Sequence, residues 1–131
     1  IVENCTIESN KYPKGLKNIN DSININYNGS IECINKYKNI AVIGTRKASE
    51  NGLKIAYETG AFLAKNNING EWSALGCDTE ALRGALDNGG RCIVLLPCGL
   101  DNIQPKSNRS LADRIVQNGG CLISEYNVGH H

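Results

Sequence analysis

A short turn carries the residues best suited to binding chemistry: Gly44-Thr45-Arg46-Lys47-Ala48-Ser49. It follows a continuously apolar run and precedes a stretch with helical spacing. Gly44 permits a close approach of the backbone, whereas Thr45 and Ser49 offer hydroxyl groups. Free N–H groups at a helix start attract anions, and Arg46, next to Lys47, can hold a phosphate through two parallel hydrogen bonds. We therefore predict a phosphate site, the alternative being a plain strand–helix turn with a solvated Arg-Lys pair.

Similar residues follow the second strand-like segment. Gly76 and Asp78 come directly after it. Asp78 either caps the next helix or accepts a hydrogen bond from a ribose or base. Arg83 lies one turn into that helix, where it faces either the crevice or solvent.

The third segment leads to a second candidate phosphate contact. Gly99 clears space at the strand end, and Lys106, Asn108 and Arg109 lie beside the start of another helix. The alternative is a solvated helix start capped by Ser107 or Asn108. None of these turns is a P-loop or a G-x-G-x-x-G motif, so we do not expect a classical nucleoside triphosphate or dinucleotide site.

Histidine-based chemistry is excluded, because the only two histidines, His130 and His131, stand at the terminus and are typical of a purification tag. No pair of carboxylates is spaced for acid–base work, so we predict no catalytic residue, metal or cofactor. The six cysteines contain no C-x-x-C pair, and Cys92 and Cys121 lie in apolar runs. We expect free buried thiols and a reducing, cytoplasmic location.

Alternating strand and helix patterns predict an α/β, Rossmann-like three-layer fold. Apolar runs at 40–43, 92–96 and 121–124 predict buried strands, and 68–73 occupies the place of a poorer one. Three faces with helical spacing predict the helices between them: Leu53, Ala56, Gly60 and Leu63; Ala81, Leu82, Ala85 and Leu86; Leu111, Ala112, Ile115 and Val116. Asn-Gly-Gly at 88–90 and at 118–120 ends two helices. Right-handed crossovers then give a mostly parallel sheet with both faces covered and a ligand crevice at the carboxyl ends of its strands.

The length of 131 residues fits a single globular unit. We divide it into an extension over 1–38, with an edge strand at the alternating Ile23, Ile25 and Tyr27, a Rossmann-like domain over 39–129, and a tag remnant at 130–131. The net charge of +1 excludes a globally basic nucleic-acid binder, so any phosphate contact depends on a local cluster. No apolar run is long enough to span a membrane, and we expect no membrane partner.

Four stretches resemble the core of the DprA/Smf family, the DNA-processing proteins of natural transformation. They are AVIGTRKAS at 41–49, ALGCDTEALRGAL at 74–86, LPCGLDN at 96–102 with Pro105 and Asn108, and GGCLISEY at 119–126. Tyr12-Pro13 with Leu16 and Ile19 is similar to the segment before that core. The order and spacing of these motifs agree over most of the chain.

The resemblance implies a binding protein without catalytic turnover that binds single-stranded DNA, dimerises and helps to load the RecA recombinase. In the family a Gly-Thr/Ser-Arg turn contacts DNA phosphates, which implies that role for Gly44, Thr45 and Arg46. The region of Lys106 is carried over less directly.

Three departures from the family pattern change this expectation. Glu71-Trp72-Ser73 stands where the family usually has Ser-Gly-Leu, so Trp72 either fills the crevice or stacks on a base. Leu82 stands where the family often has histidine. The chain ends soon after Tyr126, where family members continue, so we expect about half of a DprA-type core, which exposes sheet edges and self-associates.

A second function fits the same residues. Rossmann-like relatives of the SLOG group sense small nucleotide-derived signals, and a miniature of this kind would serve as a sponge for an immune signal. The near-neutral charge, the shortened core and Trp72 favour this alternative. An enzyme of the related phosphoribohydrolase type is disfavoured, because its P-G-G-x-G-T-x-x-E signature is absent.

Overall fold

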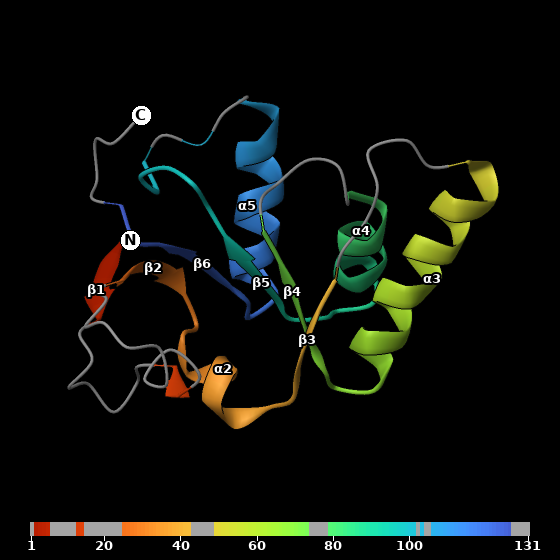
Figure 1. Ribbon diagram of the computed structural model, residues 1–131, viewed down its shortest axis with the longest axis horizontal. Coiled ribbons are helices and arrows are strands. Elements are labelled where there is room, and N and C mark those ends of the chain that lie inside the picture. The colour runs from red at the N-terminus through yellow and green to blue at the C-terminus, as the bar shows by residue number, and fades with distance from the viewer. Residues whose placement is uncertain are drawn as a thin grey trace.

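In the part of the chain that the structure describes, six strands form one sheet in the order β1-β2-β6-β5-β4-β3 (Figure 1). This computed structural model describes residues 2–5, 13–14, 25–42, 49–73, 79–101, 103 and 106–126. The strands are β1 (Glu3–Cys5), β2 (Ile25–Gly29), β3 (Asn39–Ala41), β4 (Asn69–Trp72), β5 (Cys92–Leu95) and β6 (Cys121–Ser124). The helices are α2 (Glu32–Lys36), α3 (Glu50–Lys65), α4 (Thr79–Asp87) and α5 (Ser107–Gln117).

The sheet is mostly parallel, which confirms the predicted α/β fold. Strands β3, β4, β5 and β6 pair in parallel, each beside the next one in the chain. Strand β2 pairs antiparallel with both β6 and β1, so it lies inside the sheet. The edge strand expected around Ile25 and Tyr27 is therefore an interior strand, and β1 forms the edge; Ile23 lies outside the described residues.

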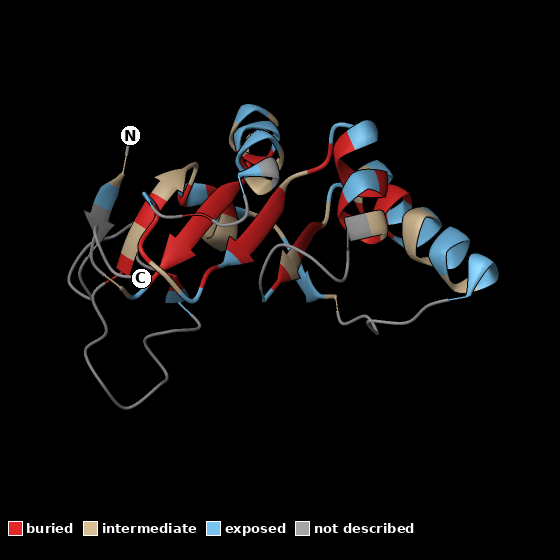
Figure 2. Cartoon of the chain, turned by 90° about the horizontal axis from the view of Figure 1, so that it is seen from above, coloured by how far each residue is buried: buried red, intermediate tan, exposed pale blue. Residues whose placement is uncertain are grey.

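The strand order decides which face each helix covers. Because every parallel strand is added on the same side of the previous one, right-handed crossovers place α3, α4 and α5 on one face. A core cluster joins Leu82 of α4 and Ile115 of α5 to Val94 and Leu122 of the sheet. On the opposite face, α2 packs its Cys33 against a second cluster. In Figure 2 the buried residues follow the middle strands, between these layers.

The second face is covered only in part by the described residues. Alternation along β5 puts Ile93 and Leu95 on the α2 side, since Ile93 belongs to the cluster on that face. Ile93 is buried, whereas Leu95 is 42% exposed. Among the described residues, the expectation of two covered faces is met over the middle strands on the α3–α5 side and only in part on the α2 side.

Helices α3 and α4 touch backbone to backbone at two glycines. A Cβ atom on Gly60 would overlap the carbonyl oxygen of Ala81, and one on Gly84 would overlap the carbonyl oxygen of Tyr57. The contact is therefore reciprocal, with each helix placing a glycine against the main chain of the other. The Tyr57 hydroxyl also donates to the Asp87 carboxylate, 2.8 Å away.

The predicted helix ends are confirmed where glycine is needed. Gly89 and Gly119 have φ of 74° and 86°, the left-handed conformation that stops α4 and α5. At the start of α3, where either Ser49 or Asn51 could act as the cap, the Ser49 hydroxyl accepts from Gly52 N–H at 3.1 Å, so Ser49 is the cap.

The starts of α5 and α4 differ from that of α3. Helix α5 begins after Lys106 with no side-chain cap, so the expected capping by Ser107 or Asn108 is wrong: both lie within the helix. Thr79 is the first residue of α4, and Asp78 lies outside the described residues.

Three cysteines are free and buried as expected: Cys33, Cys92 and Cys121. Burial raises the pKa of the Cys33 thiol to about 11 and that of Cys92 to about 12, because a thiolate loses its hydration in the core. Cys98 is half-buried and forms no disulfide with another described cysteine. Within the described ranges, no helix is long and apolar enough to cross a membrane.

We predict that Gly84→Ala lowers the free energy of unfolding by about 2 kcal/mol or more, because the added methyl forces α3 away from α4. Alanine would otherwise favour an interior helix position by ~1 kcal/mol, so a loss must come from the helix contact. Urea unfolding followed by circular dichroism measures the change. Glu58→Ala, at an exposed position of α3, is the control, and equal stability of the two variants would contradict the close contact.

Candidate nucleic-acid interface

Three loops leave the same edge of the sheet. Because β3, β4 and β5 are parallel neighbours, their carboxyl ends lie side by side. The chain continues from these ends after Val42, Ser73 and Leu96. In open parallel sheets this edge is where ligands bind. The predicted residues Gly44, Thr45, Arg46, Lys47, Gly76 and Asp78 belong to the first two loops and lie outside the described residues.

Ser49 stands at the far end of the first loop. Its hydroxyl is occupied by the cap of α3, where it accepts from Gly52 N–H. The predicted role as a phosphate ligand through this hydroxyl therefore competes with the cap. As the cap, Ser49 still determines where α3 begins. The free N–H groups of the first turn of α3 point out of the helix at this end.

Trp72 lies in the core. The side chain is 1% exposed, and it belongs to the cluster between the sheet and helices α4 and α5. Residues two apart share a face of a strand, and Gly70 leaves room for the ring: a Cβ atom there would overlap the indole. The indole Nε1 has no hydrogen-bond partner among the residues that the structure describes. The ring fills the interior and presents no open face to a base, so the stacking role considered above does not fit this structure.

Arg83 faces solvent, the second of its two expected orientations. Its guanidinium pairs with the Glu80 carboxylate at 2.7 Å, and 52% of the Arg83 side chain is exposed. The pair joins residues one turn apart on the outer surface of α4.

The residues predicted after the third strand gather at the start of α5. Gly99 is buried in the bend after β5, and Lys106 is exposed directly before the helix. The Arg109 Nε donates to the carbonyl of Ile103 at 3.3 Å, which ties the helix start to the preceding loop. Asn108 is half-buried beside them. Two cations thus lie within one turn of the α5 N-terminus, where the helix dipole attracts anions.

Ser124 holds the end of β6, a role that the motif alone did not indicate. The hydroxyl donates to the Cys98 carbonyl at 2.6 Å and accepts from Tyr126 N–H at 3.0 Å. The side chain is only 2% exposed. A serine at the end of an otherwise apolar run was the available signal, because a buried hydroxyl requires such partners.

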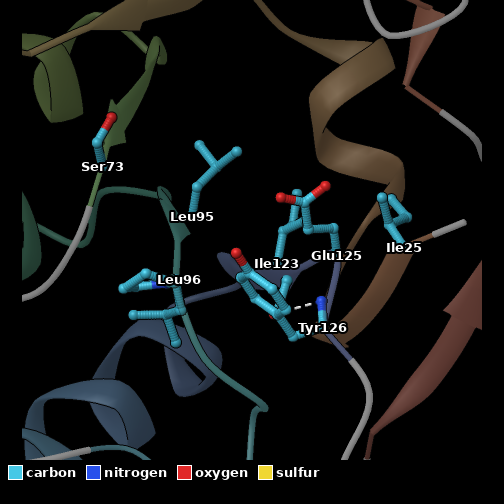
Figure 3. A pocket seen from close by; sticks show the side chains of 9 residues that line it. Ile25, Ser73, Leu95, Leu96, Ile123, Glu125 and Tyr126 are labelled. Carbon is cyan, nitrogen blue, oxygen red and sulfur yellow. Dashed lines mark hydrogen bonds between the residues drawn. The ribbon is translucent and has the colours of Figure 1, made fainter. Parts of the chain in front are cut away.

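A cavity of about 360 Å³ opens beside these strand ends (Figure 3). Its apolar wall comes from Ile25, Leu95 and Ile123, and Glu125 and Tyr126 contribute polar atoms. A second hollow of about 410 Å³ shares Leu95 and Ile123 and extends towards α2. Nothing in the described ranges brings together three histidine, cysteine, aspartate or glutamate side chains to hold a metal ion.

The Glu71 carboxylate lies in the second hollow, and among the described residues it makes no hydrogen bond or ion pair. Partial burial raises the pKa of its carboxyl, because the ionised form loses hydration there. This loss of hydration raises the free energy of the folded protein when Glu71 is ionised. Glu71 therefore destabilises the folded state at neutral pH.

Comparison with known proteins places the chain beside DNA-processing proteins. The family model described as DNA recombination-mediator protein A matches residues 3–131. DNA processing protein DprA of Streptococcus pneumoniae is 34% identical over 119 residues, and protein Smf of Borreliella burgdorferi is 33% identical over 120 residues. These matches cover 90% and 89% of this chain but only 42% and 38% of the relatives.

Solved structures give the same picture. The crystal structure of DprA from Streptococcus pneumoniae superposes with a TM-score of 0.82 at 32% identity, covering 98% of this chain and 45% of that one. DNA processing protein A from Helicobacter pylori, in a structure concerned with its single-stranded DNA binding mode, superposes with a TM-score of 0.79 at 29% identity. That match covers 98% of this chain and 58% of the other.

We predict that Glu71→Gln stabilises the protein at neutral pH. In the wild type, the unfolded chain loses its Glu71 proton at a lower pH than the folded chain does, so stability falls as the pH rises above 4.5, the ordinary glutamate value. The gain from glutamine should disappear below that pH. Urea unfolding across the acid-to-neutral range measures it, with Glu58→Gln as the exposed control; a gain independent of pH would contradict the burial of this carboxyl.

Proposed function

Because the chain belongs to the DprA/Smf family of DNA recombination-mediator proteins, we propose that it binds single-stranded DNA without catalytic turnover. The observation that carries the proposal is the convergence of three loops at the carboxyl ends of β3, β4 and β5. The family-type turn Gly44-Thr45-Arg46 belongs to the first of them. The relative from Helicobacter pylori, with its single-stranded DNA binding mode, supports the choice of ligand.

In this proposal the backbone of DNA is held at two helix starts. Arg46 and Thr45 bind one phosphate before α3, and Lys106 and Arg109 bind another before α5. Gly44, Gly76 and Gly99 allow the main chain to approach the strand, Lys47 adds local charge, and Asp78 and Asn108 accept or donate at the sugar and base edges. With a net charge of +1, affinity comes from these local contacts and not from the overall field.

RecA and a second copy of the chain are the proposed protein partners. The chain spans less than half of the Streptococcus pneumoniae relative, so RecA loading, an activity of whole family members, stays a proposal on the resemblance alone. The small nucleotide-derived ligand loses one of its supports, because Trp72 occupies the core and not the crevice. If the protein did not bind DNA, a small nucleotide-derived ligand would be the function to test next.

We predict that a fluorescent oligothymidine binds the wild type at low salt and that Arg46→Ala weakens binding about ten-fold or more, because one charged phosphate contact is lost. Fluorescence anisotropy across a salt series gives the affinity, and the salt slope should fall by about 0.7 for each contact removed. Lys106→Ala should act in the same direction. Arg83→Ala, which removes an arginine already paired with Glu80, is the matched control and should bind like the wild type.

Absence of binding at low salt, or equal loss in the Arg46 and Arg83 variants, would overturn this proposal. The only tryptophan gives a further readout. Since Trp72 is 1% exposed, we predict that its emission stays unquenched when the oligonucleotide binds. Strong quenching would instead indicate that a base reaches the indole.

A further inference from the structure

A buried hydroxyl holds the beginning of the β5–α5 connection to the sheet. Main-chain bonding between β5 and β6 reaches Leu96, whose N–H donates to the Ile123 carbonyl at 2.8 Å. The chain then bends, and at this point the Ser124 hydroxyl donates to the Cys98 carbonyl at 2.6 Å. This separation is at the short end of the range for O–H···O bonds. A side chain of β6 therefore continues the contact between the two chain segments beyond the end of β5.

Ser124 belongs to a strand that is held from both sides. Strand β6 lies between β2 and β5 and pairs with both of them. The buried Ser124 oxygen also accepts from Tyr126 N–H at 3.0 Å. The Tyr126 carbonyl in turn accepts from the Asn26 side chain of β2 at 2.8 Å. Because a hydroxyl has one proton to donate, these contacts define the orientation of the Ser124 side chain and direct that proton to Cys98.

The bend at Cys98 leads to the cations at the start of α5. After it, the buried side chains of Leu100 and Ile103 join the core cluster that α5 also contributes to. The Ile103 carbonyl accepts from Arg109 Nε at 3.3 Å, and Lys106 directly precedes the helix. The end of β6 is thus connected, through the bend and the loop after it, to both cations.

We infer that Ser124 is a positioning residue for the phosphate contact proposed at Lys106 and Arg109. The inference rests on the proposed function, because it concerns the same binding site. Ser124 carries no charge and is buried, so it acts without touching the DNA. It holds the bend at Cys98, and with it the start of α5, at the carboxyl edge of the sheet. Binding requires this because hydrogen bonds to phosphate weaken steeply when their geometry is distorted.

A purely structural role of Ser124 would have a different signature. If the hydroxyl only satisfied buried polar groups at the end of β6, its loss would lower the stability of the protein and reduce the folded fraction. The folded molecules would still make the same number of phosphate contacts. A positioning role predicts instead that a contact is lost from the complex itself. The salt dependence of the affinity counts these contacts, with a slope of about 0.7 for each phosphate of a single strand.

The test is fluorescence anisotropy with a labelled oligothymidine over a salt series, with folding checked by circular dichroism. Ser124→Ala exchanges one neutral side chain for another, yet we expect it to lower the salt slope by about 0.7, as Lys106→Ala does. The affinity at low salt should fall about five-fold. Ser124→Cys keeps the volume with a weaker donor and serves the same test if the alanine variant does not fold. Ser110→Ala, which removes an exposed hydroxyl from α5, is the matched control and should leave both values unchanged.

A double-mutant cycle assigns the effect to one of the two helix starts. Adding Ser124→Ala to Lys106→Ala should cost less affinity than it does in the wild type, because the contact is already lost. Adding it to Arg46→Ala should cost the full amount, since that contact lies before α3. An unchanged salt slope in Ser124→Ala, or equal additional losses in the two backgrounds, would refute the positioning role and leave DNA binding itself intact. A wild type that binds no DNA would refute the proposed function and this inference together.

Discussion

The buried amide of Asn69 holds the amino ends of the sheet together. Its Nδ2 donates to the Cys33 carbonyl of α2 and to the Asn39 side chain, each at 2.9 Å, and its Oδ1 accepts from Arg91 at 2.8 Å. The residue is 0% exposed, which is tolerable because its polar atoms are partnered. The Arg91 guanidinium also stacks on the Tyr37 ring at 3.6 Å. One side chain therefore aligns the starts of β3, β4 and β5 and anchors α2 beneath them, and this alignment brings their opposite ends to a common edge.

The two ends of the sheet thus have different tasks. The amino ends are fixed by a saturated polar network, and the helix layer above them is fixed by the backbone contact at Gly60 and Gly84. The carboxyl ends lead into the loops that we assign to DNA. At the same edge, the Ser124 hydroxyl joins the end of β6 to the bend after β5 by donating to the Cys98 carbonyl. A ligand at this edge would meet strand ends whose positions are fixed by the hydrogen bonds of the sheet.

Local signals were sufficient for much of the fold and failed where a distant residue decides. Runs of apolar residues predicted β5 and β6, and glycines with positive φ stop α4 and α5 as expected. Strand β4 looked poor because Gly70 and Glu71 are weak strand formers; Gly70 is explained by the Trp72 ring above it. The sequence pattern places Trp72 in the crevice because it does not indicate the space that Gly70 leaves for the ring in the core. Helix α2 has only five residues and no side-chain cap, so it left no pattern to detect.

The pairing of β2 with β6 has a consequence for the order of folding. From β3 to β6, each strand adds beside the one made just before it, so this region can assemble progressively during synthesis. Strand β2, by contrast, closes a loop of nearly a hundred residues: Asn26 pairs with Ser124, and its side chain donates to the Tyr126 carbonyl. Until β6 has left the ribosome, Ile25 and Tyr27 have no sheet to join, and β1 has only β2. Strands β1 and β2 leave the ribosome before β3–β6 but are therefore secured after them, and the apolar side chains of β2 are the ones that nascent-chain chaperones would meet.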